Sequence, residues 1–99
     1  MNLKKLEELF YNFSEECPLD GFSLIENKLS IRSDIHALLL LDRLLPSKKS
    51  IITAAGHDVI YLGIDLEDLA EVITEDQIKE LVYSGVSFDS DKNSLYMFI

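Results

Sequence analysis

The sequence predicts one α+β domain over residues 1–99: a mainly antiparallel sheet of about four to six short strands packed with about three or four helices. Three observations lead to this prediction. The chain has 99 residues, which is the size of one domain. Hydrophobic residues make up 47% of it, enough for a core without disulfides. Apolar residues also switch between helical spacing and short runs typical of strands.

The first half of the chain contains two predicted helices. Over residues 2–16, apolar side chains recur at three- and four-residue spacing, and Cys17-Pro18 ends the pattern because the residue before a proline avoids the α region. A second helix is expected over 34–45, with Ser33 as its N-cap. This segment is apolar almost all round, so we expect other elements to contact it on most sides.

The second half contains two short acidic helices, expected over residues 66–73 and 75–84. Asp65 is positioned to cap the first, and the stretch from Thr74 to Gln77 has the pattern of a capping box for the second. Gly85 stands where a helix-terminating glycine is usual.

Strands are expected in the remaining segments. Alternating residues predict a hairpin over 22–31, and a strand candidate covers 50–54. The apolar run 59–64 is the strongest strand pattern and predicts a central strand that is buried on both faces. The last hairpin is expected to pair 86–89 with 94–99.

The charge of the chain is strongly acidic and unevenly distributed. The formal net charge is −9 and the isoelectric point is about 4.5, which argues against direct binding of nucleic-acid phosphates through a broad basic face. Residues 1–50 have a net charge of −1, whereas residues 51–99 have a net charge of −8. The acidity is therefore concentrated in the second half.

Eight acidic residues within 58–80 are the predicted partner-binding residues. They are Asp58, Asp65, Glu67, Asp68, Glu71, Glu75, Asp76 and Glu80. Acids near helix starts favour the helix dipole, so a solvated outer face explains five of them without a partner. Asp58, Glu71 and Glu80 have no such local reason. The alternative is an electrostatic surface that docks on a basic protein groove.

No residue pattern predicts catalysis, a metal site or a cofactor. His57 beside Asp58 in a loop is the best candidate for a general base, but no nucleophile motif accompanies it. His36 lies in a first helical turn, where a structural or exposed role is usual, and Cys17 is expected to be a small, half-buried apolar residue. The stretch from Asp89 begins like a calcium loop but lacks the glycine and the glutamate that such a loop needs.

The location predicted for the protein is the cytoplasm. Lys4 and Lys5 are not followed by the apolar stretch of a signal peptide. The segment from Ile35 to Leu45 is about half the length needed to cross a bilayer, so no membrane contact is expected.

Two stretches resemble the C-terminal part of small uncharacterised proteins encoded by bacteriophages and prophages. They are DLEDLAEVITEDQIKELVYSGV, from Asp65 to Val86, and SLYMFI, from Ser94 to Ile99. The resemblance covers less than half of the chain and has no catalytic motif, so it assigns no role to any residue. It implies a phage or mobile-element origin, where small acidic proteins often inhibit host nucleic-acid machinery in defence or repair.

The resulting expectation is a non-catalytic acidic module that acts as a DNA mimic and binds to the basic surface of a host protein. Two alternatives stay open. One is a structural or regulatory phage protein that forms homo-oligomers, with a homodimer as one form. The other, least favoured, is a small hydrolase-like enzyme that uses His57 and Asp58.

Overall fold

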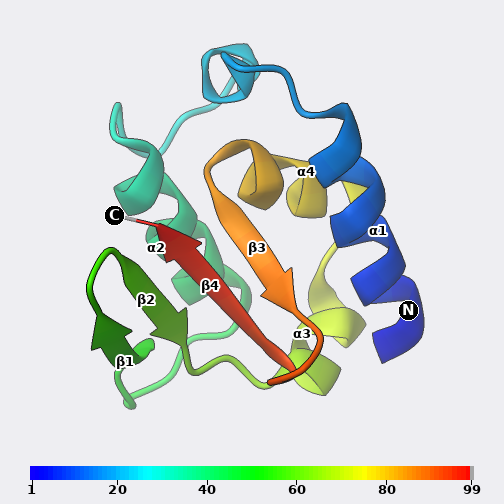
Figure 1. The fold of residues 1–99 in the computed structure, drawn as a ribbon, viewed down its shortest axis with the longest axis vertical. Helices are drawn as coiled ribbons and strands as arrows, with labels where there is room; N and C mark the ends of the chain where they lie inside the picture. Colours follow the sequence, from blue (N-terminus) through cyan, green and yellow to red (C-terminus); the bar gives the residue numbers. More distant parts are fainter. Residues whose placement is uncertain (99) are drawn as a thin grey trace.

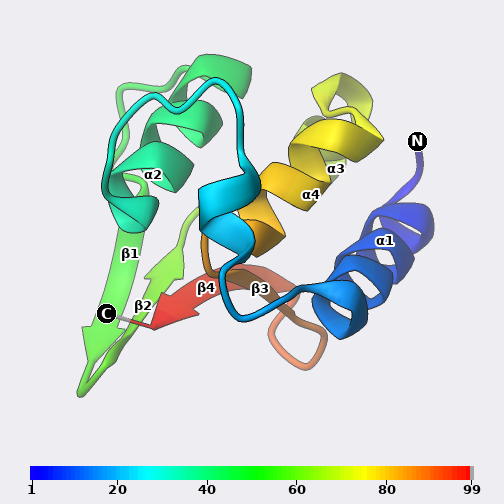
Figure 2. The same cartoon turned by 90° about the horizontal axis from the view of Figure 1, so that it is seen from above.

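A four-stranded antiparallel sheet lies on one side of the molecule and four α-helices cover one of its faces (Figures 1 and 2). The computed structural model describes residues 1–98. The strand order is β1-β2-β4-β3, and every neighbouring pair is antiparallel. The strands are β1 (Ile52–Gly56), β2 (Val59–Leu62), β3 (Val86–Asp89) and β4 (Ser94–Phe98). The predicted α+β class is confirmed, while Ile99, the last residue of the predicted final strand, lies outside the described residues.

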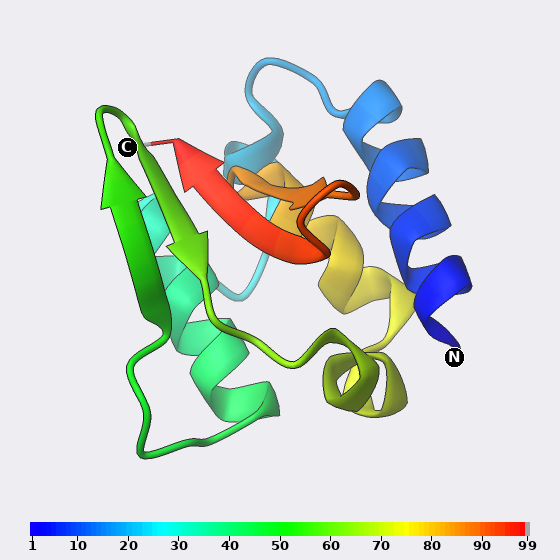
Figure 3. The ribbon, with the colours of Figure 1, turned by 60° about the horizontal axis from the view of Figure 1, so that its bottom comes forward.

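The helices follow the predicted order closely. They are α1 (Leu3–Glu16), the 3-10 helix η1 (Gly21–Leu24), α2 (Ser33–Leu44), α3 (Leu66–Val72) and α4 (Glu75–Tyr83). Helix α1 packs against α4, α3 and β3, and α2 contacts α4. Figure 3 shows α3 and the N-terminus at one corner of the molecule and the tip of the β1–β2 hairpin at the opposite corner.

The helix caps of the acidic segment are confirmed. The Asp65 carboxylate accepts hydrogen bonds from two backbone N–H groups in the first turn of α3. The Thr74 hydroxyl accepts from the Gln77 N–H at 3.2 Å, and the Gln77 side chain accepts from the Thr74 N–H at 2.9 Å. Gly85 follows α4 with a φ of +100°, which a side chain would strain.

The predicted cap of α2 is wrong. Ser33 is already the first helical residue, and the preceding Arg32 occupies the cap position with an extended backbone and no side-chain cap. The Arg32 guanidinium instead forms an ion pair with Asp34 at 3.1 Å. The carboxylate of Asp34 also lies in the first turn, where it favours the helix dipole.

The predicted hairpin over 22–31 is also wrong, because η1 and an irregular segment occupy these residues. The Leu29 N–H donates to Nδ1 of His36 at 3.0 Å, so it is not available to a strand ladder. The Lys28 ammonium donates to the Ile25 carbonyl at 2.8 Å. Ile25 is buried while Ile31 is 92% exposed, so the alternation that suggested strands does not match burial.

Strand β2 is internal to the sheet, as predicted, but it is buried on one face only. Ile60 and Leu62 point into the core, whereas Tyr61 is half-buried on the opposite face and stacks near Tyr96. The physical reason is that all helices lie on the same side of the sheet (Figure 2). Strand β1 begins two residues later than expected and is exposed throughout.

Helix α2 is less enclosed than its sequence predicts. Ala37 and Leu41 are fully buried, but Ile35 and Leu39 are 37% and 40% exposed. The helix lies at one side of the helical layer, so only one of its faces meets the core (Figure 2). The prediction of contacts on most sides is therefore wrong.

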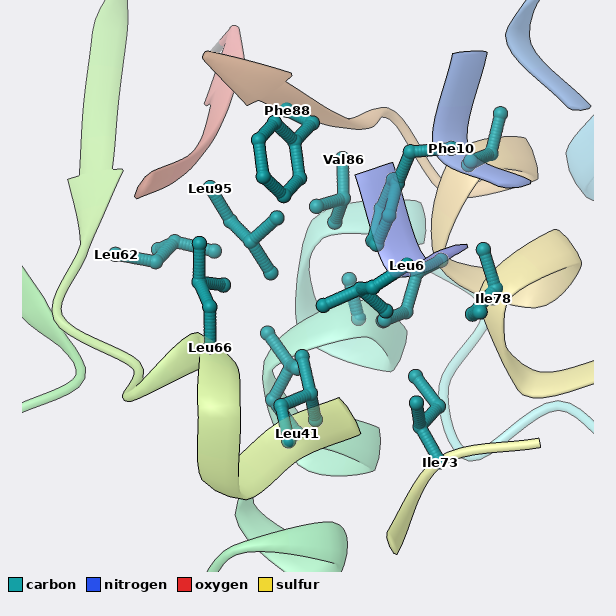
Figure 4. Close-up of a cluster of buried hydrophobic side chains, with 14 of the residues drawn as sticks. Leu6, Phe10, Leu41, Leu62, Leu66, Ile73, Ile78, Val86, Phe88 and Leu95 are labelled. Carbon is teal, nitrogen blue, oxygen red and sulfur yellow. The ribbon is translucent and has the colours of Figure 1, made fainter. Parts of the chain in front are cut away.

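The core lies between the sheet and the helices (Figure 4). Leu62, Phe88 and Leu95 enter it from the strands, and Leu6 and Leu41 enter it from α1 and α2. No helix of the described chain is long and apolar enough to span a bilayer.

Candidate functional site

Six of the eight predicted partner-binding residues gather on α3 and the start of α4. This acidic surface consists of Asp65, Glu67, Asp68, Glu71, Glu75 and Asp76, all of which are exposed. Among residues 1–98, none of the six forms a salt bridge. Apart from Asp65, whose carboxylate caps α3, the carboxylates of the acidic surface are therefore left free for a partner.

The other two predicted residues lie elsewhere. Asp58 is exposed in the turn between β1 and β2, which lies far from α3 in all three ribbon views (Figures 1 to 3). Glu80 lies on α4 but is only 31% exposed, because its side chain faces α2. Each thus has a different environment from the six exposed acids.

A pocket of about 650 Å³ is lined by residues of both α2 and α4. The segment that follows η1 arches from α4 to α2 and forms a third wall (Figure 2). Apolar side chains from this segment and from α2 line part of the pocket, including Leu29 and Leu40. Arg43 and Lys79 contribute positive charge, and the acids at the pocket include Glu80. The volume is in the range of small-molecule sites in proteins.

His36 lies in the wall of this pocket and is 1% exposed. Its Nδ1 accepts from the Leu29 N–H, so in the neutral ring the proton is on Nε2. Nε2 is buried without a hydrogen-bond partner, and the closest carboxylate oxygen is Oε1 of Glu80 at 3.6 Å. That distance is too long for a hydrogen bond. The pocket therefore contains a buried donor with an unsatisfied proton.

Sequence reasoning did not find this pair. It gave His36 a structural or exposed role and grouped Glu80 with the surface acids. The one available signal was that Glu80 has no helix-capping reason to be acidic. The pairing requires α2 and α4 to be neighbours, and 43 intervening residues separate the two positions in the chain.

The alternative catalytic candidates are far less organised. His57 and Asp58 are both exposed, and within residues 1–98 no hydrogen bond or ion pair joins them. His57 has a φ of +46°, which a tight turn requires. Burial raises the pKa of the Cys17 thiol, which keeps this thiol protonated and poorly nucleophilic at neutral pH. No group of three or more metal-ligating side chains was found in the described part of the chain.

A second electrostatic feature lies on the outer face of the sheet. The Lys92 ammonium stands 4.1 Å from the centre of the Tyr61 ring. The contact with Tyr61 raises the pKa of Lys92, the charge of Asp89 raises it further, and desolvation acts in the opposite direction. The arrangement fixes the β3–β4 turn over β2.

No protein-family model, no curated protein and no solved structure matches this chain. The phage resemblance therefore stays a prediction.

Proposed function

We propose that the protein is a non-catalytic acidic binding module that docks on the basic surface of a partner protein. The observation that carries this proposal is the acidic surface itself: six exposed carboxylates on α3 and α4 with no ion pair among the described residues. The partner is a protein whose basic groove binds nucleic acid, and the acidic surface competes for that groove. A phage origin and a host defence or repair complex as the target are part of the same proposal.

The local structure supports a rigid presentation of these charges. Asp65 and Thr74 cap the two helices, and the buried Leu69, Ile78 and Leu81 fix them to the core. Carboxylates on fixed helices lose less conformational freedom on binding than carboxylates on a loop. An ordered array also steers a positively charged partner during the diffusional encounter.

The test uses two variants with the same net charge. The acid-neutralised variant carries Glu67→Gln, Asp68→Asn, Glu71→Gln, Glu75→Gln and Asp76→Asn. The matched control carries five exposed changes elsewhere, namely Glu8→Gln, Glu15→Gln, Glu16→Gln, Asp42→Asn and Asp91→Asn. Asp65 is left unchanged in both because its carboxylate caps α3.

The native protein and both variants are immobilised and exposed to a bacterial lysate. We expect a partner that binds the native protein and the matched control but not the acid-neutralised variant. Duplex DNA should displace it, and raising the salt from about 0.05 to about 0.5 M should release it, because the charges are exposed and screened. Retention of the same partner on the acid-neutralised variant, or at high salt, would contradict the proposal.

Self-association is the second candidate function, and the uncovered face of the sheet is the observation that favours it. Ala54, Tyr61, Tyr96 and Ser87 form one cross-strand row on this face. Phe98 follows in the next row and is 65% exposed. Exposed apolar patches on a protein surface are typical of contact surfaces.

Sedimentation velocity tests this second candidate. A dimer that forms with rising concentration and is lost in Phe98→Lys would support it, because a buried ammonium on that face opposes contact. A monomer at all concentrations would contradict self-association.

A further inference from the structure

The pocket between α2 and α4 holds a polar group that the fold leaves unsatisfied. Nε2 of His36 is buried and has no partner, although buried side-chain donors are nearly always hydrogen-bonded. The Leu29 N–H fixes the tautomer by occupying Nδ1, so turning the proton to the other nitrogen would break that bond. An acceptor is therefore missing beside Nε2, and the pocket is the space from which one can be supplied.

The neighbouring Glu80 restricts what this acceptor can be. Its Oε1 is 3.6 Å from Nε2 of His36. A ligand carboxylate would accept from Nε2 but would be repelled by the Glu80 carboxylate. A ligand ammonium would pair with Glu80 but has no lone pair to accept from Nε2. A hydroxyl group complements both, because it accepts from one side and donates to the other.

The other lining residues indicate what the remainder of the ligand must be. Leu29 and Leu40 provide apolar surface, and Tyr83 of α4 also lines the pocket, with the Lys79 ammonium 5.4 Å from the centre of its ring. Glu80 is half-buried and lines the pocket together with His36. A volume of about 650 Å³ accommodates a small molecule with one or more rings.

We propose that this pocket binds a small molecule that carries an apolar ring and one hydroxyl group, which accepts from His36 Nε2–H and donates to the Glu80 carboxylate. A water molecule has the same bonding pattern, so the ligand hydroxyl reproduces the bonds of a water that it displaces. The apolar body then gains contact with the leucine-lined wall. This site differs from the acidic surface, with which it shares only Asp76.

The test is an NMR titration of the native protein with four probes of the same ring size: p-cresol, toluene, benzoate and benzylamine. We expect p-cresol to shift the backbone resonances of Leu29, Lys79 and Tyr83 and the imidazole Nε2 resonance of His36. Two hydrogen bonds predict binding about tenfold tighter for p-cresol than for toluene, which has no hydroxyl group. Benzoate and benzylamine should also bind more weakly than p-cresol.

Two variants separate a binding site from a structural histidine. In Glu80→Leu, the hydroxyl loses one of its two partners, so the advantage of p-cresol over toluene should fall from about tenfold to about threefold while the backbone spectrum outside the pocket stays unchanged. His36→Leu should have the same effect on p-cresol binding if this variant folds. If His36→Leu does not fold, the result for Glu80→Leu alone tests the proposal. Equal binding of p-cresol and toluene to the native protein, or shifts that lie outside the pocket, would overturn the proposal.

Discussion

The capping box at the start of α4 gives the most direct local prediction, because this helix presents Glu75 and Asp76. Thr74→Ala removes the hydroxyl that accepts from the Gln77 N–H at 3.2 Å. The reciprocal bond from the Thr74 N–H to the Gln77 side chain, at 2.9 Å, does not require the threonine hydroxyl. Both bonds are exposed, so the loss should be close to the usual value for an N-cap, about 1 kcal/mol.

Thermal unfolding followed by circular dichroism measures this loss. For a domain of this size, about 1 kcal/mol corresponds to a fall in Tm of about 4–8 °C. Thr74→Ser keeps the hydroxyl and should unfold close to the native temperature. In the double variant with Gln77→Ala, the two losses should not add, because the bonds form one reciprocal unit. If Thr74→Ala and Thr74→Ser unfolded at the same temperature, the capping box would not stabilise α4.

Three further predictions concern the fold and the sheet surface. Gly85→Ala should destabilise the protein by about 1–2 kcal/mol because its φ is +100°, whereas Gly56→Ala meets no atom within 4 Å and should be nearly neutral in chemical denaturation. Leu41→Ala should cost about 2–5 kcal/mol in the same assay, since Leu41 is completely buried. In Tyr61→Phe, the pKa of Lys92 should fall toward its ordinary value because the Tyr61 hydroxyl group is lost, and NMR titration of the lysine resonances measures this. Because the pKa of Lys92 is raised in the native fold, the contact stabilises the protein below the ordinary lysine pKa, and this stabilisation is lost as the pH rises through the raised value. An unchanged Lys92 pKa in Tyr61→Phe would contradict the contact.

The elements that could be predicted from the sequence are those fixed by local chemistry. Helix α1 repeats its apolar residues at helical spacing, and the caps at Asp65 and Thr74 depend on residues two or three positions away. The hairpin of β3 and β4 has polar turn residues between two alternating strands. In each case the signal and the structure lie within a few residues of each other.

Apart from the local error at the cap of α2, the errors arose where a distant contact decides the structure. Residues 22–31 alternate as a strand does, but the Leu29 N–H bonds to His36 on α2, which no local pattern contains. The apolar run of β2 does not reveal that every helix lies on one side of the sheet, so Tyr61 was expected to be more enclosed than it is. Proximity of His36 and Glu80 depends on the same long-range packing.

The acidic surface could be predicted only in part. The six acids of this surface all lie within residues 65–76, so the sequence places them in one region. The structure shows that all six are exposed. Asp58 and Glu80 were grouped with them because they are near in sequence. The β1–β2 turn and the α2-facing side of α4 place these two residues elsewhere, which requires knowledge of the tertiary fold.

The central claim is that the acidic surface binds a basic partner, and the dissociation constant of the isolated complex tests it most directly. It is measured by calorimetry at low and high salt for the native protein, the acid-neutralised variant and the matched control. At low salt, the acid-neutralised variant should bind at least about tenfold more weakly, because five carboxylate charges of the acidic surface are lost. The matched control should bind about as tightly as the native protein. Native binding should also weaken steeply with salt. Equal dissociation constants for the two variants, or native binding that does not change with salt, would contradict the account.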